Sequence, residues 1–388
     1  MYTIQTLNRI SDCIREVLPE GRYRIDEAAQ APDAVLVRSA DMHGMEAPQS
    51  LLAVARAGAG YNNIPVDEYT KRGVCVFNTP GANANAVAEL VLLGLLLSGR
   101  RVVDGIEWAR ALKGRESVPG LVEKGKGQFA GPELRGKTLG VIGLGAIGIL
   151  VANAAAQGLG MTVLGEDPFI SVQHAWSLSR AVQRVDSVEE ILAQSDFVTV
   201  HVPLSEKTRG MIDSAALARM KPGARLLNFS RAELVDGEAV RAALQAGKLA
   251  AYITDFPTDD MLGAPGVVCI PHLGASTPES EENCARMAAE ELRAYLETGS
   301  IHNSVNLPEM QLGRPEGARL QVIHANAPGM VSRISAIISG EGINIENMTN
   351  KGRGDWAVTV LETDQPLPES AMEALRALPQ AVRVRAVL

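Results

Sequence analysis

Two side chains in the second half of the chain have the chemistry needed to oxidise an alcohol. Arg231 follows an apolar run that ends in Asn-Phe-Ser, and His272 comes near the end of GVVCIPHLG. A guanidinium can clamp a carboxylate with two hydrogen bonds and polarise the adjacent carbonyl. An imidazole can take up a hydroxyl proton near neutral pH while hydride leaves the same carbon. The pair therefore predicts hydride transfer from a secondary alcohol that carries a carboxylate.

Each of these residues also has an ordinary structural explanation. The alternative for Arg231 is a surface residue at a helix start that pairs with Glu233 or Asp236. His272 lies in a Pro-His-Leu-Gly turn that it could simply cap, and His201, at the end of the run FVTVH, competes for the role of base by position alone.

Three carboxylates favour His272 over the competing histidine. Asp255, Asp259 and Asp260 all come shortly before it. A carboxylate on one imidazole nitrogen fixes the tautomer and favours the protonated ring. The sequence therefore predicts a histidine and carboxylate pair, with the choice of carboxylate left open.

A glycine motif predicts where the hydride acceptor binds. GLGAIG, Gly143 to Gly148, comes directly after the apolar run 138–142, and Asp167 follows Gly148 by nineteen residues at the end of a second apolar run. Gly143 permits a tight turn, Gly145 lets the backbone approach a pyrophosphate, and Gly148 lets helix pack closely on strand. A carboxylate at Asp167 would accept bonds from the ribose hydroxyls, which favours NAD over NADP. The alternative is an ordinary strand-to-helix turn with a solvated acidic strand end.

The composition limits the class of protein. The chain has 388 residues, of which 46% are hydrophobic and 21% charged, with a net charge of −8. These values predict a globular protein of two or three domains with no general attraction to nucleic acid or to an anionic membrane. The four cysteines have no paired spacing, so neither a metal site nor a disulfide framework is expected. The N-terminus lacks the pattern of a secretory signal, which predicts a cytoplasmic location.

Short apolar runs alternate with helical patterns, which predicts parallel α/β sheets with working loops at their carboxyl edges. Strands are expected at 34–37, 51–55, 74–77, 138–142, 161–164, 197–200, 225–228, 251–254 and 267–270, and helices at 84–101 and 279–298. The segment 114–131 is expected to be a loop or an extended arm. The last seventy residues predict a ferredoxin-like βαββαβ unit with strands 319–325, 343–348, 356–362 and 381–387 and helices 329–339 and 369–377.

This organisation predicts two doubly wound, Rossmann-like domains and a small ferredoxin-like domain. The expected boundaries are 1–97 with 279–308 for the substrate domain, 98–278 for the cofactor domain, 309–317 for a linker and 318–388 for the small domain. The active site is expected in the cleft between the first two.

Nearly the whole chain resembles the D-2-hydroxyacid dehydrogenases. The resemblance rests on specific stretches in the order of that family, VRSA (37–40), AGAGYNNI (57–64), FNTPGAN (77–83), VAEL (87–90), GKTLGVIGLGAIG (136–148), EDPF (166–169), HVPL (201–204), MKPGARLLNFSRAELVD (220–236) and PHLGASTPES (271–280). The resemblance implies catalytic roles for Arg231, Asp259 and His272. It implies cofactor contacts by Gly143, Gly145, Ala146, Ile147, Gly148, Asp167, His201, Pro203, Thr208, Ser230 and Asp255, and substrate contacts by Arg38, Ser39, Gly58, Ala59 and Gly60.

Two positions depart from the pattern of that family. Asp259 stands where the family usually has the glutamate that partners the histidine, so Asp260 is an alternative. Thr254 stands where the family has an aspartate that contacts the nicotinamide, and Asp255 lies one position later. A shift of one residue along a strand reverses the face of the side chain.

Residues 318–388 resemble an ACT domain, the small-molecule-sensing module of many biosynthetic enzymes. The resemblance implies that His324, Asn326 and Asn344 contact L-serine between paired subunits. The alternative is that the two asparagines cap turns and the domain only dimerises.

Together, the resemblances imply NAD-dependent oxidation of 3-phosphoglycerate to 3-phosphohydroxypyruvate, the entry to serine synthesis, with L-serine as effector. A broader 2-hydroxyacid dehydrogenase acting on glycerate, glyoxylate or 2-oxoglutarate, and a non-catalytic NAD-sensing corepressor, are the alternatives. Arg38, Lys124, Lys126 and Arg135 are the candidates for the substrate phosphate. The apolar residues of helix 84–101 and the arm after it, together with the tail, predict a homo-oligomer, either a dimer or a tetramer.

Overall fold

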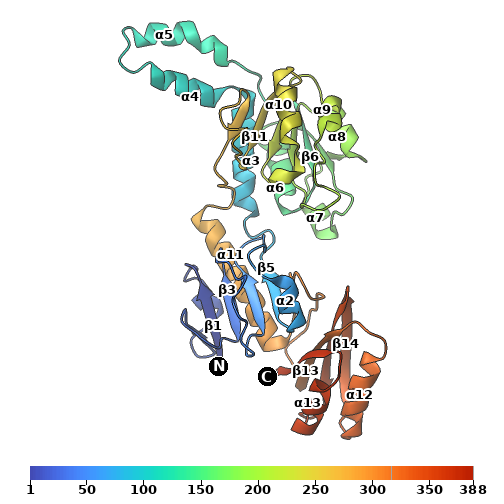
Figure 1. Ribbon diagram of the computed structural model, residues 1–388. Helices are drawn as coiled ribbons and strands as arrows, with labels where there is room; N and C mark the ends of the chain where they lie inside the picture. Colours follow the sequence, from blue (N-terminus) through green and yellow to red (C-terminus); the bar gives the residue numbers. More distant parts are fainter. Residues whose placement is uncertain (316, 388) are drawn as a thin grey trace. The chain divides into compact units, whose positions relative to one another are not determined.

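The computed structural model describes residues 1–315 and 317–387, which form two compact units (Figure 1). One unit contains residues 1–83 and 278–388, and the other contains residues 84–277. The sequence predicts these boundaries at 97/98 and 278/279. In the structure the first boundary lies before residue 84, so the helix that begins there belongs wholly to the second unit. Among the described residues, no helix is long and apolar enough to cross a bilayer.

The first unit begins with a parallel sheet in the order β2-β1-β3-β4-β5. Its strands are β1 (Tyr2–Leu7), β2 (Tyr23–Ile25), β3 (Ala34–Val37), β4 (Ala53–Arg56) and β5 (Cys75–Asn78). All four residues of β3 are buried, as expected for a strand covered on both faces. This strand order is that of a doubly wound sheet, whose ligands bind beyond the carboxyl ends of the strands.

Helix α11 (Pro278–Thr298) packs on this sheet after the chain returns from the second unit. Its apolar stripe, which includes Ala288, Leu292 and Leu296, is fully buried in the core of the sheet. The shorter helices α1 (Ile14–Val17) and α2 (Val66–Lys71) complete this part of the unit. The helix predicted at 279–298 is therefore confirmed.

The tail has the predicted βαββαβ order. Its elements are β13 (Ala318–Ala325), α12 (Met330–Gly340), β14 (Ile345–Arg353), β15 (Trp356–Thr363), α13 (Glu369–Arg376) and β16 (Ala381–Val387), in an antiparallel sheet ordered β14-β15-β13-β16. Strand β14 continues to residue 353, whereas the strand predicted from the sequence ends at residue 348. It extends this far because its polar second half pairs with β15 up to a tight turn at Gly354.

The two faces of the tail sheet meet different partners. On β13, Leu320 and Val322 face α12 and α13, whereas Ile323 belongs to the core shared with α11 and the N-terminal sheet. Successive residues of a strand point to opposite faces, so Arg319 and Gln321 lie on the same face as Ile323. The small domain is thus packed onto the rest of its unit through one sheet face.

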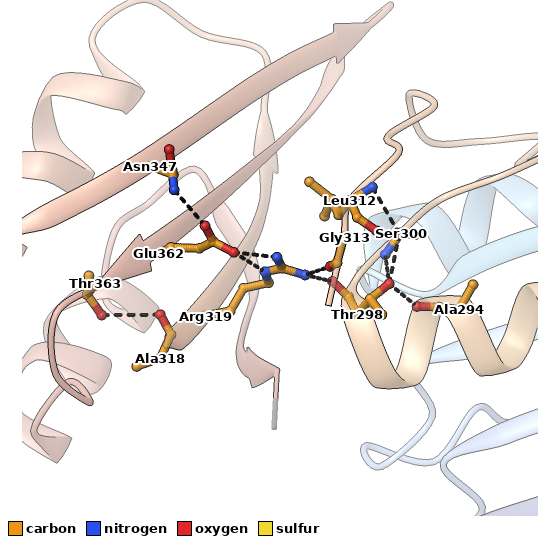
Figure 2. Close-up of polar contacts among 10 residues, drawn as sticks. All are labelled: Ala294, Thr298, Ser300, Leu312, Gly313, Ala318, Arg319, Asn347, Glu362 and Thr363. Atoms are coloured by element: carbon orange, nitrogen blue, oxygen red, sulfur yellow. Dashed lines mark hydrogen bonds and ion pairs between the residues drawn. The ribbon is translucent and has the colours of Figure 1, made fainter. Parts of the chain in front are cut away.

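Buried polar contacts hold this junction. Figure 2 shows the Arg319 guanidinium donating to the carbonyls of Thr298 and Gly313, both at 2.7 Å, while it pairs with Glu362. The side chain of Asn347 donates to the other oxygen of Glu362 at 2.8 Å. Because the Arg319 side chain is only 4% exposed, loss of either partner would leave a buried charge uncompensated.

The second unit is a seven-stranded parallel sheet in the order β12-β11-β10-β9-β6-β7-β8. Its strands are β6 (Thr138–Ile142), β7 (Thr162–Glu166), β8 (Val182–Arg184), β9 (Phe197–Val200), β10 (Ala224–Asn228), β11 (Leu249–Thr254) and β12 (Val267–Cys269). The order reverses between β6 and β9, which is the point where such sheets bind dinucleotides. Its helices include α3 (Ala84–Gly99), α6 (Ala146–Gln157), α7 (Val172–Ser177), α8 (Val188–Gln194), α9 (Ser214–Arg219) and α10 (Gly237–Gln245). The predicted fold class is confirmed for both units.

Most of the segment 114–131, expected to be a loop or an extended arm, is helical, and another helix precedes it. Helices α4 (Val102–Ala111) and α5 (Val118–Gly125) and the 3₁₀ helix η1 (Lys126–Phe129) form a projecting hairpin in the second unit (Figure 1). Neither α4 nor α5 buries a residue. The expectation of irregular structure was wrong because most glycines of this segment lie in turns or at helix ends, where glycine does not destabilise a helix as it does in the interior.

Candidate active site

The glycine motif forms a tight turn at the reversal point of the seven-stranded sheet. Gly143 directly follows β6 and has φ +92°, and a Cβ atom there would lie 2.6 Å from the carbonyl oxygen of His201 at the end of β9. A Cβ atom on Gly148 would lie 2.0 Å from the carbonyl oxygen of Gly143. These two contacts give the physical reason for glycine at both positions.

The middle glycine of the motif faces open space. A Cβ atom on Gly145 would meet nothing within 4 Å, and Gly145 directly precedes α6 without a side chain to cap that helix. The first amides of α6 are therefore free to bind an anion. At the end of β7, Asp167 accepts hydrogen bonds from the amides of Leu144 at 2.9 Å and Phe169 at 2.8 Å. The donor set and the acidic strand end fit the pyrophosphate and the ribose of a dinucleotide.

His201 is poorly suited to act as a base. Its Nε2 lies 3.0 Å from the hydroxyl of Thr199, and its Nδ1 is buried with no partner among the described residues. Burial lowers the pKa of His201 to about 4, so the ring is neutral at physiological pH. A group with so low a pKa is a weak proton acceptor near pH 7. This observation favours His272 as the base.

Arg231 lies beyond the carboxyl end of β10. Its backbone is fixed by the buried Asn228, whose amide nitrogen donates to the carbonyl of Arg231 at 2.8 Å. Its guanidinium is exposed and donates to the carbonyl of Ser230 at 2.6 Å. Asp236, one proposed structural partner, instead caps α10 through the amide of Ala239. The arginine is therefore presented to solvent on a rigid turn.

Asp255 is buried between the two candidate catalytic residues. It follows β11, whose neighbours in the sheet are β10, which leads to Arg231, and β12, which leads to His272. Burial raises the pKa of Asp255, and the nearby charges of His272 and Arg231 act in the opposite direction. Asp255 is only 1% exposed, and its Oδ1 has no hydrogen-bond partner among the described residues. The strand order thus brings a buried acceptor to both residues.

His272 is held in a strained backbone conformation beside this carboxylate. It has φ +22°, in the region that favours glycine, and its amide donates to the carbonyls of Asp255 at 3.1 Å and Ile270 at 3.0 Å. Its exposed ring packs against Phe256, with centroids 5.0 Å apart. Non-glycine residues with such backbones often occur at functional sites.

The other two carboxylates are less closely engaged with the histidine. Asp259 is exposed on the loop after β11. Asp260 accepts a hydrogen bond from Thr258 at 2.6 Å and pairs with Arg241 at 3.3 Å. The role of Asp259 stays a proposal, and Asp255 is the one of the three carboxylates whose pKa the charge of His272 lowers.

The remaining cofactor candidates lie around the same edge. Ala146 and Ile147 begin α6 beside the glycine turn. The hydroxyl of Thr208 donates to the carbonyl of Pro203 at 2.7 Å in the loop after β9, and the hydroxyl of Ser230 donates to the carbonyl of Val200 at 2.8 Å. These bonds fix loops next to the proposed cofactor site, and contacts with the cofactor itself stay predictions.

The substrate candidates belong to the first unit. Arg38 follows β3 and pairs with Glu281 of α11 at 2.7 Å, and the amide of Ser39 donates to the side chain of Asn8. The carbonyls of Gly58 and Ala59 accept hydrogen bonds from Thr79 and Asn78, which fixes the glycine loop that continues through Gly60.

Arg56 is a neighbour of this loop that sequence reasoning missed. Its guanidinium comes within 2.4 Å of where a Cβ atom of Gly58 would be. The charges of Arg56 and Arg38 both act on the thiol of Cys284 in α11. Arg56 could have been found from its position, because it ends β4 and β4 pairs with β3, the strand that leads to Arg38.

The serine candidates do not meet within one chain. His324 is buried, with Nδ1 2.8 Å from the carbonyl of Ala325 and Nε2 2.8 Å from the hydroxyl of Thr359. Asn326 lies at the end of β13 and donates to the carbonyl of Gly354, whereas Asn344 lies beside Asp364, near the start of β13. A strand of this length separates its ends by roughly 23 Å. A site that contains both asparagines therefore requires two copies of the domain.

Two alanine substitutions should separate folding from cofactor binding. Gly148→Ala should lower the stability of the unit by about 1–3 kcal/mol, because the new Cβ meets backbone. Gly145→Ala should leave the stability of the free protein unchanged and weaken NADH binding, because its Cβ enters the space predicted for pyrophosphate. Thermal unfolding and NADH fluorescence titration measure the two effects. Unchanged NADH affinity in Gly145→Ala would contradict the proposed cradle.

Comparison with known proteins identifies the family of this chain. Residues 94–274 match the family model for the D-isomer specific 2-hydroxyacid dehydrogenase, NAD binding domain, and residues 318–380 match the ACT domain model. The chain is 34% identical over 355 residues to D-3-phosphoglycerate dehydrogenase of Escherichia coli (strain K12), covering 88% of this chain and 82% of the relative. It is 35% identical over 333 residues to D-3-phosphoglycerate dehydrogenase of Methanocaldococcus jannaschii, covering 81% of this chain and 61% of the relative.

Solved structures share the fold of this chain. The NAD⁺-bound 3-phosphoglycerate dehydrogenase of Entamoeba histolytica has a TM-score of 0.61 and 26% identity, covering 79% of this chain and 98% of that one. The apo form of Rhodotorula graminis D-mandelate dehydrogenase has a TM-score of 0.67 and 25% identity, covering 81% and 99%. This chain therefore belongs to the D-isomer specific 2-hydroxyacid dehydrogenases, as an NAD-binding oxidoreductase with a C-terminal ACT domain.

Proposed function

We propose that the protein oxidises 3-phosphoglycerate to 3-phosphohydroxypyruvate, with L-serine as its effector. The observation that carries the chemistry is the set of Arg231, Asp255 and His272 at three adjacent strand ends. The likeness to D-3-phosphoglycerate dehydrogenases over most of the chain, together with the ACT domain, supports this substrate. The product is that of the first step of serine synthesis, which is consistent with a cytoplasmic enzyme.

The residues of the chain have separate roles in this proposal. NAD, when bound at the glycine turn, supplies the hydride acceptor. Arg231 binds the substrate carboxylate and polarises the reacting carbon–oxygen bond. His272 takes the hydroxyl proton as hydride leaves, and in the reverse direction it returns that proton. Asp255 or Asp259 orients His272 and stabilises its protonated form.

The substrate phosphate needs a cationic partner. Arg38 and the newly found Arg56 come from adjacent strand ends, and guanidinium groups bind phosphate with two parallel hydrogen bonds. Lys124 and Lys126 lie on the exposed helical arm of the second unit, whereas the two arginines lie beside the glycine loop named above as a substrate candidate. We favour the two arginines, and Arg135 stays an alternative.

A substrate panel tests the proposal. The purified protein with NAD should reduce NAD fastest with 3-phosphoglycerate when compared with glycerate, lactate and 2-hydroxyglutarate, and NADH absorbance gives the rate. Comparable rates with unphosphorylated acids would favour the broader dehydrogenase. Binding of NADH without turnover of any acid would instead favour a non-catalytic NAD sensor.

Added L-serine should slow this reaction. Because Asn326 and Asn344 lie at opposite ends of the sheet, the proposed serine site forms between paired copies, and the protein should be a dimer or a tetramer. Initial rates measured against L-serine, with glycine as the control, test the effect, and Asn344→Ala should weaken it without changing the rate in the absence of serine. A flat serine response would remove the regulatory proposal and leave the chemistry intact.

A further inference from the structure

A cavity of ≈ 520 Å³ lies in the first unit at the C-terminal end of α11. Its lining contains none of the residues assigned above to catalysis, cofactor, substrate or serine. Three segments far apart in the sequence form it: the turn before β2, the last turns of α11 and the segment that leads into the ACT domain. Its volume lies in the range of small-molecule sites.

The charges inside this cavity leave two arginines available. Glu297 is already satisfied, because it accepts hydrogen bonds from Tyr23 at 2.8 Å and from Arg22 at 3.3 Å. Arg293 donates to the carbonyl of Val17 at 3.4 Å. Both Arg293 and Arg314 are exposed, and among the described residues neither forms an ion pair with a carboxylate.

The end of α11 does not repel an anion here. The carboxyl end of a helix carries partial negative charge on its last carbonyls. In this chain those carbonyls are occupied: Arg385 donates to Tyr295, Arg319 to Thr298, and Gln321 to Gly299. Figure 2 shows Arg319 at the carbonyl of Thr298, near Ser300 and Leu312. Of these four residues, Thr298, Ser300 and Leu312 line the cavity. The ACT domain thus neutralises the helix end that borders the cavity.

Arg314 and Arg293 belong to parts of the chain that must stay together for the ACT domain to remain docked. Arg314 follows Gly313, whose carbonyl binds Arg319, and Leu312 is hydrogen-bonded in both directions to Ser300. A ligand held by both arginines would therefore bridge α11 and the segment that enters the ACT domain.

We propose that this cavity is a second effector site, which binds a small molecule with two acidic groups. One guanidinium holds each group, because planar guanidinium groups suit carboxylate and phosphate oxygens. Glu290 also lines the cavity and disfavours a ligand of higher negative charge. The two sources of such chemistry are dicarboxylates and molecules with two phosphate groups.

Calorimetric titration of the full chain tests the site. Glutarate is the probe for two carboxylates and methylenediphosphonate for two phosphate-like groups, at constant ionic strength, with butyrate as the single-charge comparison. At least one probe should saturate the site and bind more tightly than butyrate. Arg293→Gln and Arg314→Gln should each weaken that binding about tenfold or more, since each removes a charge-assisted contact.

Two further variants identify where the probe binds. Arg15→Gln changes an exposed arginine that pairs with Asp12 and Glu20 outside the cavity, and it should leave the affinity unchanged. Arg231→Gln should also leave it unchanged, since Arg231 belongs to the other unit. Equal affinity in wild type and both cavity variants would overturn the proposal, as would heats that never saturate or loss of binding only in Arg231→Gln. Thermal unfolding of each variant without probe verifies its folding.

Discussion

His272→Ala should lower the turnover number by about 10²–10⁴, the usual contribution of a general acid–base group. The imidazole is exposed and is held beside Asp255 by its own backbone amide, so its removal should disturb little else. NADH affinity and the thermal midpoint should stay close to wild type, because the glycine turn and the core are untouched. Steady-state rates with saturating 3-phosphoglycerate measure the loss.

A parallel substitution at the other histidine makes the result specific. His201→Asn removes a ring whose pKa burial lowers to about 4, so it should cost less turnover than His272→Ala. A larger loss in His201→Asn than in His272→Ala, or near-normal turnover in His272→Ala, would contradict the assignment of the base.

The elements of the fold were predictable because their signals are local. The glycine motif, the buried apolar strands and the long stripe of α11 each follow from periodicity and turn chemistry within a few residues. The exposed hairpin of α4 and α5 was missed because it has no buried stripe, and its glycine-rich composition is typical of loops. A helix is usually recognised in a sequence by the apolar stripe that it packs on other elements, and an exposed helix has no such stripe.

The candidate site was predictable only in part, because its geometry depends on strand order. The residue types of Arg231 and His272 indicated their chemistry. That Asp255 lies between them follows from the pairing of β11 with both β10 and β12, which no short-range pattern contains. Arg56 was missed for the same reason, since its contact with Gly58 is set by a turn after β4.

The proposed serine site in the tail also depends on strand pairing. There the pattern identified the domain, but the register of β15 against β13 and β14 places Asn326 and Asn344 at opposite ends of the sheet. The proposed serine site therefore depends on a second copy, as the resemblance implies.

Asp255→Asn should reduce kcat/KM with 3-phosphoglycerate by roughly 10²-fold or more, as expected when a catalytic histidine loses its carboxylate. Burial raises the pKa of Asp255 in the folded state. At a pH above the pKa that this aspartate has in the unfolded chain, its ionised form therefore lowers the stability of the fold. Asparagine removes that buried charge, and the thermal midpoint at pH 7 should therefore stay the same or rise. Asp259→Asn is the matched control at the exposed carboxylate. If Asp259→Asn lowered kcat/KM and Asp255→Asn did not, Asp259 would be the partner of His272, and the buried Asp255 would have no part in orienting it.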